Sequence, residues 1–143
     1  MTTYLVGRID RIVRRALEVL VEDQGVSVVG YTAMSVLAAR PGLSNAELAR
    51  RSFVTAQGMS QTLTSLAADG LIRRTPASDN RRVQRVELTD RGRRVVRVCT
   101  ARVAAYEREL LAVLSPGQRA DLNAMLRAIV DSNRASGDAR VSR

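Results

Sequence analysis

The 143-residue sequence has no histidine, no lysine and no tryptophan, and it has only one cysteine. Without histidine, histidine-based acid–base catalysis is excluded, and with one cysteine a zinc site is nearly excluded as well. A single cysteine also excludes an internal disulfide. The sequence contains neither an apolar run long enough to span a bilayer nor a signal-peptide pattern, so we expect a cytoplasmic protein without a cofactor, metal or membrane partner.

All 23 basic residues are arginines, against 14 acidic residues, and the formal net charge is +9. Genomic base composition accounts for the choice of arginine over lysine, but it does not account for the excess of positive charge. Nine arginines fall between Arg73 and Arg97, where only three acidic residues occur. Because the planar guanidinium suits phosphates and guanine edges, this concentration of arginine indicates a nucleic-acid partner.

Apolar residues spaced three and four apart predict a mainly helical chain. Ser44 with Glu47, and Ser115 with Gln118, have the spacing of capping boxes, in which each side chain satisfies the other residue's free amide. The predicted helices cover residues 5–20, 31–39, about two turns from Ser44, 55–69 with Thr55 as cap, 90–113, and a last helix from Pro116 that gives way to a frayed tail from about residue 135.

Residues 71–89 are predicted to form a β-hairpin that carries arginines. Two short strands flank a loop with Arg81 and Arg82, and the first strand follows directly on the helix that Asp69-Gly70 ends. A helix followed by a charged hairpin is typical of a winged helix-turn-helix, which puts one element in a DNA groove and another on the backbone beside it. We therefore predict a mainly α (α+β) fold with this motif at its centre.

The helix over 55–69 has an unusual polar face. Its apolar residues are Met59, Leu63 and Leu66, and the opposite face carries small or uncharged hydrogen-bonding groups in place of Lys, Glu or Arg. Glutamine pairs bidentately with adenine, and hydroxyls adapt to several partners, so this face suits the edges of bases. An ordinary solvated face is the alternative interpretation, which the short preceding helix and the following hairpin disfavour.

The chain has the length of one domain, residues 1–143, built around a DNA-binding lobe of residues 30–89. The flanking segments, residues 1–24 and 90–135, have strong apolar stripes and little of the lobe left to cover. We expect these dimerisation helices to pack on a second copy of the chain. A two-fold homodimer also suits DNA reading, because symmetric half-sites match symmetric subunits.

Six short motifs along the chain are each weak evidence for a family, but their order and spacing together are specific. They are Pro41-Gly42-Leu43-Ser44, Ala46-Glu47-Leu48-Ala49, Asp69-Gly70-Leu71-Ile72-Arg73-Arg74, Arg81-Arg82, Val86-Glu87-Leu88-Thr89-Asp90-Arg91-Gly92 and Leu114-Ser115-Pro116. Through them the chain resembles the MarR family of bacterial transcriptional regulators over essentially its whole length. The resemblance implies a dimer that mostly represses transcription from pseudo-palindromic operators and releases double-stranded DNA on binding a small, often aromatic, anion.

Carried over position by position, the resemblance makes residues 55–69 the recognition helix. It implies groove contacts from that helix, a phosphate contact at its start, backbone contacts from the start of the wing, and an arginine at the wing tip in the minor groove. In the same order, these residues are Gln57, Ser60, Gln61 and Thr64; Thr55; Arg73 and Arg74; and Arg81 and Arg82.

Two positions depart from the family pattern. The family usually has Asp two residues before the wing-tip arginine, and counting back from Leu88-Thr89 this position is Asn80, with the acid shifted to Asp79. Either Arg81 pairs with Asp79, or Arg82 is held more weakly by Asn80, so which arginine enters the groove stays open. The second departure is Gly30, where the family often has Thr as a helix cap; glycine is an acceptable cap.

A ligand pocket between the dimerisation helices and the DNA-binding lobe is implied by the resemblance alone. By position its candidates are Tyr4, Arg8, Arg11, Tyr31 and Met34. Tyr4 and Arg8 lie one turn apart and could meet an aromatic acid. The alternative is an exposed helix face with Tyr31 in the core.

Three other functions fit the sequence less well. An enzyme is disfavoured because the sequence has no histidine, no Gly-rich phosphate loop and no pair of carboxylates at a useful spacing. A winged-helix protein-interaction module would differ from a DNA-binding protein in its weak dependence on salt. A thiol-based redox sensor would need an exposed, stabilised thiolate, whereas Cys99 falls on an apolar stripe and is expected to be a buried structural residue.

Overall fold

A computed structural model describes the backbone of residues 1–141 and the side chains of residues 1–133. The chain divides into two compact units, residues 1–104 and the segment from Ala105 onward, which are described separately. No helix within the described backbone is both long enough and apolar enough to cross a membrane.

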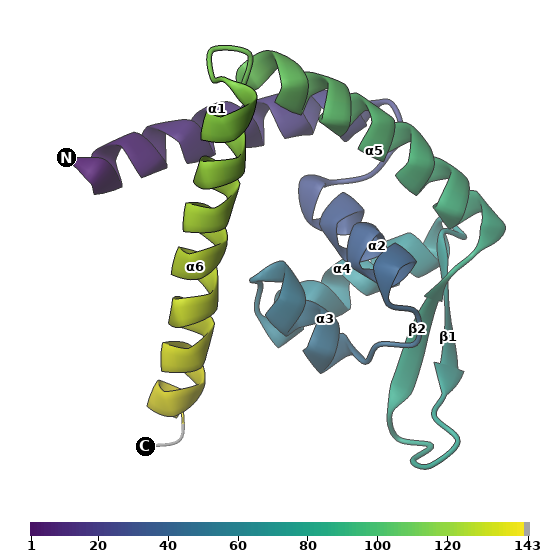
Figure 1. Cartoon of the computed structure of the whole chain (residues 1–143). Helices are drawn as coiled ribbons and strands as arrows, with labels where there is room; N and C mark the ends of the chain where they lie inside the picture. Colours follow the sequence, from purple (N-terminus) through teal and green to yellow (C-terminus); the bar gives the residue numbers. More distant parts are fainter. Residues whose placement is uncertain (142–143) are drawn as a thin grey trace. The chain divides into compact units, whose positions relative to one another are not determined.

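The first unit contains five helices and one hairpin (Figure 1). Its elements are α1 (Thr2–Glu22), α2 (Val28–Ala39), α3 (Asn45–Ser52), α4 (Ala56–Ala68), β1 (Ile72–Pro76), β2 (Gln84–Leu88) and most of α5 (Asp90–Leu110). The second unit contains the end of α5 and α6 (Pro116–Val141). The predicted order of helices, hairpin and helices is therefore confirmed.

Side-chain caps begin α3, α4 and α6 where the sequence predicts them. The Glu47 amide donates to Ser44 Oγ at 3.3 Å, and the Ser44 amide donates to Glu47 Oε2 at 2.7 Å, which completes the predicted capping box of α3. Thr55 Oγ1 accepts from the Gly58 amide at 3.0 Å at the start of α4. Ser115 and Gln118 form the matching pair of bonds before α6. These caps satisfy amides that have no partner within a helix.

The predicted start of α2 was wrong. The helix begins at Val28, because Ser27 Oγ accepts from the Gly30 amide at 2.9 Å and so caps the helix three residues earlier. Gly30 is therefore buried inside the first turn instead of capping it. A Cβ at Gly30 would lie 3.4 Å from Leu66 Cδ2, so the glycine gives α2 room against α4.

The predicted lengths of the last two helices were also wrong. α5 ends at Leu110, so Val113 lies in the following turn, 88% exposed, and does not continue the buried stripe. α6 runs to Val141, past the frayed tail predicted from about residue 135. The Ser115 capping box restarts the chain in helical conformation, but nothing local in the sequence measures how far either helix continues.

The core of the first unit joins α2, α3, α4 and the hairpin. Among its fully buried side chains are Met34, Leu37, Leu48, Met59 and Leu63. The two strands pair antiparallel with Ile72 opposite Leu88 and Arg74 opposite Val86. The segment before α3 adds a short third edge, where the Val86 amide donates to the Leu43 carbonyl at 2.9 Å and the Gly42 amide donates to the Val86 carbonyl at 3.0 Å.

Large apolar side chains remain exposed on α1 and on α6. On α1 they include Leu5, Ile9 and Ile12, which recur three and four residues apart. On α6 they are Met125, Leu126, Ile129 and Val130, each more than 40% exposed. Stripes of this kind are larger than the scattered apolar residues of ordinary surfaces and mark association sites.

The start of α5 lies unusually close to the turn before β1. A Cβ built on Gly92 would lie 2.0 Å from the Leu71 carbonyl oxygen and 3.1 Å from its carbon. Both are backbone atoms of a residue that is only 2% exposed, so they have no space to move. Position 92 therefore requires glycine, because the Cβ of any other residue would clash with the Leu71 backbone.

Gly92→Ala should lower the free energy of unfolding by about 1–3 kcal/mol, the usual cost of overpacking a buried contact. Gly117→Ala is the matched control, because no atom lies within 4 Å of a Cβ there and alanine is the better helix former. Urea unfolding at one fixed protein concentration measures both. Equal midpoints for the Gly92 variant and the wild type would contradict the close approach.

Candidate nucleic-acid interface

The polar face of α4 is open to solvent. Gln57, Ser60, Gln61 and Thr64 are all exposed, and Met59, Leu63 and Leu66 on the opposite side of the helix are buried in the core. The fold therefore orients the helix as its periodicity predicts. An exposed row of amide and hydroxyl groups presents donors and acceptors without a charge of its own.

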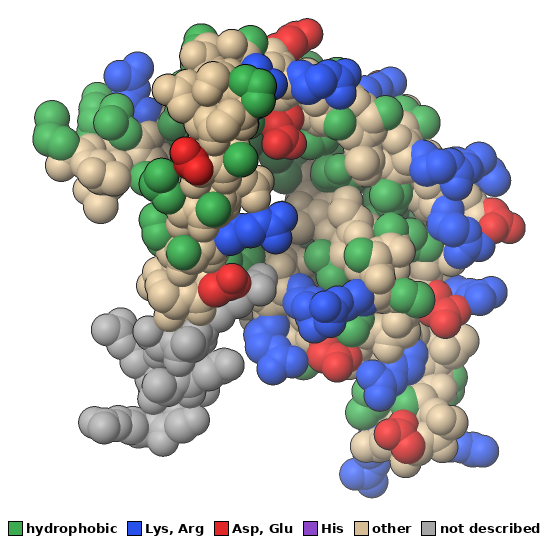
Figure 2. Space-filling view, in the orientation of Figure 1, with side chains coloured by type: hydrophobic (Ala, Val, Ile, Leu, Met, Phe, Trp, Pro, Cys, Tyr) green, Lys and Arg blue, Asp and Glu red, His purple; other side chains and the backbone are tan. Residues whose placement is uncertain are grey.

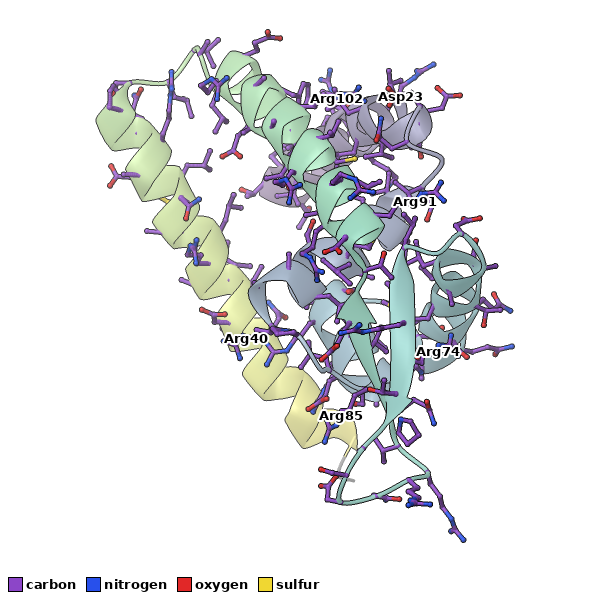
Figure 3. All side chains as sticks on the ribbon, turned by 90° about the vertical axis from the view of Figure 1, so that its right-hand side faces the viewer. Asp23, Arg40, Arg74, Arg85, Arg91 and Arg102 are labelled. Carbon is purple, nitrogen blue, oxygen red and sulfur yellow. The ribbon has the colours of Figure 1, made fainter. Side chains whose placement is uncertain are left out.

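Arg74 links the base of the hairpin to this face of α4. Its Nη2 donates to Thr64 Oγ1 at 3.4 Å, and the Thr64 hydroxyl in turn donates to the Ser60 carbonyl at 2.9 Å. Figure 3 places the Arg74 side chain beside α4. The arginine and the polar face therefore form one continuous surface.

Arg73 faces the other side of the hairpin and pairs with an acid. Its Nε and Nη2 donate to Glu87 Oε2 at 3.1 and 2.9 Å, and the two residues are direct cross-strand partners. The pair is exposed, so it adds little to stability. It does commit part of the Arg73 guanidinium, which the sequence alone did not predict.

The hairpin loop presents Arg81 and Arg82, both exposed. Asn80 Oδ1 accepts from the backbone amide of Arg82 at 3.1 Å, and the Val83 amide donates to the Asn80 carbonyl at 2.9 Å. Of the two predicted arrangements, the observed one has Asn80 contacting Arg82, through the backbone instead of the guanidinium. Asp79 makes no ion pair within the described side chains, and both arginines of the turn are exposed.

Arg85 joins the hairpin to the start of α3 and was missed in the sequence. Its Nη1 lies 3.4 Å from Glu47 Oε2 and 3.5 Å from the Gly42 carbonyl oxygen (Figure 3). Hydrogen bonds from the Ser44 amide and hydroxyl, with a smaller contribution from the Arg85 charge, hold the pKa of Glu47 below its usual value. The Glu47 carboxylate therefore caps α3 and at the same time holds Arg85 of the hairpin against the start of α3.

Arg102 joins α5 to the end of α1 and was also missed. Its Nη1 donates to the Leu20 carbonyl at 3.1 Å, and both terminal nitrogens contact the Asp23 carboxylate, one of them at 2.8 Å (Figure 3). The hydrogen bonds from Arg102 lower the pKa of Asp23. These contacts span 82 and 79 positions of the chain, so no local sequence pattern predicts them.

The predicted ligand residues are not gathered at one cavity. Arg8 lies 5.9 Å from the centre of the Tyr4 ring, and both are exposed on α1 with Arg11. The Tyr31 hydroxyl is 3.1 Å from Thr100 Oγ1, and Met34 is fully buried.

A cavity of about 440 Å³ lies instead between the end of α2, β2 and the start of α5. It combines apolar walls with Arg93 and Arg97, and none of the five predicted residues lines it. Arg93 donates to the Leu88 carbonyl at 2.8 Å and contacts Asp90. Arg97 has no hydrogen bond or ion pair within the described side chains, so its charge is available to a ligand.

Cys99 is fully buried on α5. Burial raises the pKa of its thiol, and the Arg102 charge opposes this shift only in part. A buried, protonated thiol is a poor nucleophile. The expectation of a buried cysteine is confirmed, and among the described residues no three acidic or thiol side chains gather where a metal ion could be held.

Basic side chains gather at the tip of the hairpin and over the start of α5 (Figure 2). The tip of the hairpin extends past α3 and α4 (Figure 1). The geometry is thus a helix with an uncharged hydrogen-bonding face and a basic hairpin next to it. This arrangement fits a duplex that offers base edges in one groove and phosphates at its borders.

Comparison with known proteins agrees with this geometry. Residues 24–83 match the sequence profile of the MarR family. The HTH-type transcriptional repressor Rv2887 of Mycobacterium tuberculosis is 31% identical over 123 residues, which cover 86% of this chain and 88% of the repressor.

Solved structures give the same result. The transcriptional repressor CouR bound to a 23-mer DNA duplex superposes with a TM-score of 0.84 at 25% identity, covering 91% of this chain and 92% of CouR. Rv2887 in complex with salicylic acid superposes with a TM-score of 0.72 at 30% identity, covering 89% of this chain and 94% of Rv2887. Another structure shows Rv2887 with DNA, at a TM-score of 0.72 and 29% identity over 89% of this chain and 95% of Rv2887. With its fold, its motifs and a repressor relative matched along most of both chains, this protein belongs to the MarR family.

Proposed function

We propose that this protein is a transcriptional repressor that binds a pseudo-palindromic DNA operator as a homodimer and releases it on binding a small aromatic acid. The observation that carries the proposal is the exposed, uncharged face of α4 beside a basic hairpin. In this function the protein catalyses no reaction and acts in the cytoplasm, where bacterial DNA lies.

The lobe of residues 30–89 reads the DNA in this proposal. Gln57, Ser60, Gln61 and Thr64 face the base edges of a major groove, where amide groups and hydroxyls recognise donor and acceptor patterns. Thr55 and the arginines at the base of the hairpin, Arg73 and Arg74, contact phosphates. One of the two loop arginines, Arg81 or Arg82, enters the adjacent minor groove, and the ordered turn at Asn80 favours Arg82.

The segments 1–24 and 90–135 form the dimer interface. Support comes from the exposed apolar stripes of α1 and α6, which leave Leu5, Ile9, Met125 and Ile129 about half exposed or more in the single chain. Burying such side chains stabilises association by roughly 25 cal/mol per Å² of apolar area. A dimer would also place two copies of α4 on one duplex, with a spacing set by the helical repeat of DNA.

The effector is proposed to be a small aromatic carboxylate, as the salicylic acid complex of Rv2887 suggests. Two places combine an arginine with apolar or aromatic surface. One is the α1 group predicted from the sequence, Tyr4, Arg8 and Arg11, with Tyr31 and Met34 of α2. The other is the cavity with Arg97, which we favour because it brings apolar walls together with an arginine that has no hydrogen bond or ion pair within the described side chains.

Gln61→Ala and Arg82→Ala should affect DNA binding in different ways. Loss of Gln61 should change the preferred base at one position by about 1–3 kcal/mol, because it removes a contact to a base edge. Loss of Arg82 should weaken binding to most sequences and lower the salt slope by about one. Selection from random duplexes, followed by titration at several salt concentrations, measures both. Equal weakening of all sequences by the Gln61 variant would contradict the assigned reading face.

Ile129→Glu should weaken self-association by at least about tenfold, since it buries a charge in the apolar interface of both subunits. Ala124→Glu is the matched control, because Ala124 is exposed on the opposite side of α6 from the stripe. Sedimentation analysis separates the dimer from the 15.6 kDa monomer. Unchanged association of the Ile129 variant would remove α6 from the interface.

Arg97→Ala should raise the salicylate concentration needed to release DNA by at least about tenfold, because a charged hydrogen bond to the carboxylate is lost. Arg8→Ala serves as the paired variant at the other candidate place. Titration of salicylate into the preformed complex with a selected duplex measures the effect. If Arg8→Ala loses the response and Arg97→Ala keeps it, the ligand binds at α1 and not in the cavity.

A further inference from the structure

The C-terminal end of α4 is held by the first residues of α5. Arg91 Nη1 donates to the Asp69 carbonyl at 3.0 Å, and Thr89 Oγ1 donates to the Gly70 carbonyl at 2.7 Å. Asp69 is the C-cap of α4, and Gly70 follows it with a positive φ of 68°. Carbonyls at the end of a helix have no partner within the helix, so donors from outside fix their position.

The donors themselves are held in place. The Thr89 hydroxyl also accepts from the Gly92 amide at 3.0 Å, and the Thr89 amide donates to the Leu71 carbonyl at 3.1 Å. Gly92 also lies close to Leu71. Together with that close approach, these bonds fix the start of α5 relative to the turn of residues 69–71. The Arg91 side chain lies at this junction (Figure 3).

The N-terminal end of α4 is held by a different element, α3. Asn45 Nδ2, at the start of α3, donates to the Ala56 carbonyl at 3.1 Å. The two ends of α4 are therefore tied to α3 and to α5 respectively. A shift of α5 would move the C-terminal end of α4 and leave its N-terminal end in place, so the helix would tilt about its start.

We propose that Arg91 and Thr89 are positioning residues for DNA recognition: they act through the Asp69 and Gly70 carbonyls and set the tilt of α4 against the groove. This inference rests on the proposed function. Arg91 is exposed, and its Nη1 donates to the backbone at the end of α4. Displacement should grow along the helix, so Thr64 and Gln61 should be misplaced more than Gln57.

Arg91→Ala tests the proposal, with Arg94→Ala as matched control. Arg94 is exposed on the same helix, and it forms no hydrogen bond or ion pair within the described side chains, so both variants remove one positive charge. The probes are a duplex selected by the wild-type protein from random DNA and a scrambled duplex of equal length. Affinity for both is measured at several salt concentrations.

For Arg91→Ala we expect affinity for the selected duplex to fall at least about fivefold relative to Arg94→Ala, as for loss of a charged hydrogen bond. Binding to the scrambled duplex and the salt slope should equal those of the control. A new selection with this variant should lose preference most at the bases read by Gln61 and Thr64. Arg91→Lys, which keeps a donor, should recover part of the discrimination.

Amide hydrogen exchange tests the same contact without DNA. The amides of Asp69, Gly70 and Leu71 donate to carbonyls in the last turn of α4. Their exchange should be at least about fivefold faster in Arg91→Ala and unchanged in Arg94→Ala, because the end of the helix opens more often. If the wild type selects no sequence, the proposed function fails, and exchange still tests the contact.

Three results would overturn the proposal. The first is equal discrimination and equal exchange in the two variants. The second is equal loss on both duplexes with a smaller salt slope than the control, which would make Arg91 a phosphate contact. The third is a parallel fall of thermal stability and of both affinities, which would make Arg91 a general structural residue.

Discussion

Leu71 joins three elements through its backbone, and the DNA-facing lobe depends on this connection. Its amide donates to the Leu66 carbonyl of α4 at 2.9 Å, and its carbonyl accepts from the Thr89 amide at 3.1 Å. The side chain is buried in the core that α4 shares with the hairpin. A buried backbone group without a partner is costly, so this residue holds the helix, the hairpin and the start of α5 in one arrangement. Gly92 completes the junction because any side chain there would displace the carbonyl.

Many arginines of this basic chain bind backbone carbonyls at the ends of elements. A guanidinium has five donors and no acceptor, so it suits the free carbonyls of helix and strand ends. The pairs are Arg85 with Gly42, Arg91 with Asp69, Arg93 with Leu88, Arg102 with Leu20 and Arg119 with Leu114. These guanidinium groups keep their charge but give part of their hydrogen-bonding capacity to the backbone. The arginines of the hairpin loop are a different group, because their side chains project from an ordered turn into solvent.

The surfaces that the fold leaves open are of two chemical kinds. The exposed face of α4 is polar and uncharged, and the exposed stripes of α1 and α6 are apolar. The apolar stripes would be unusual on the surface of a monomer with no partner. Together these surfaces fit a protein that forms a dimer through its apolar stripes and binds duplex DNA through α4. The Arg102 contacts with Asp23 and Leu20 join the end of α1 to α5 within the first unit.

The sequence by itself determined the order of elements, the caps at Ser44, Thr55 and Ser115, and the buried and polar faces of α4, because periodicity and capping act within a few residues. It did not determine that Ser27 caps α2, where α5 and α6 end, or which carboxylate or carbonyl oxygen each arginine binds. Arg85 with Glu47, Arg91 with Asp69 and Arg102 with Asp23 lie 22 to 79 positions apart. Such contacts exist only after the helices have packed, so only the tertiary structure decided which arginines remain free for DNA.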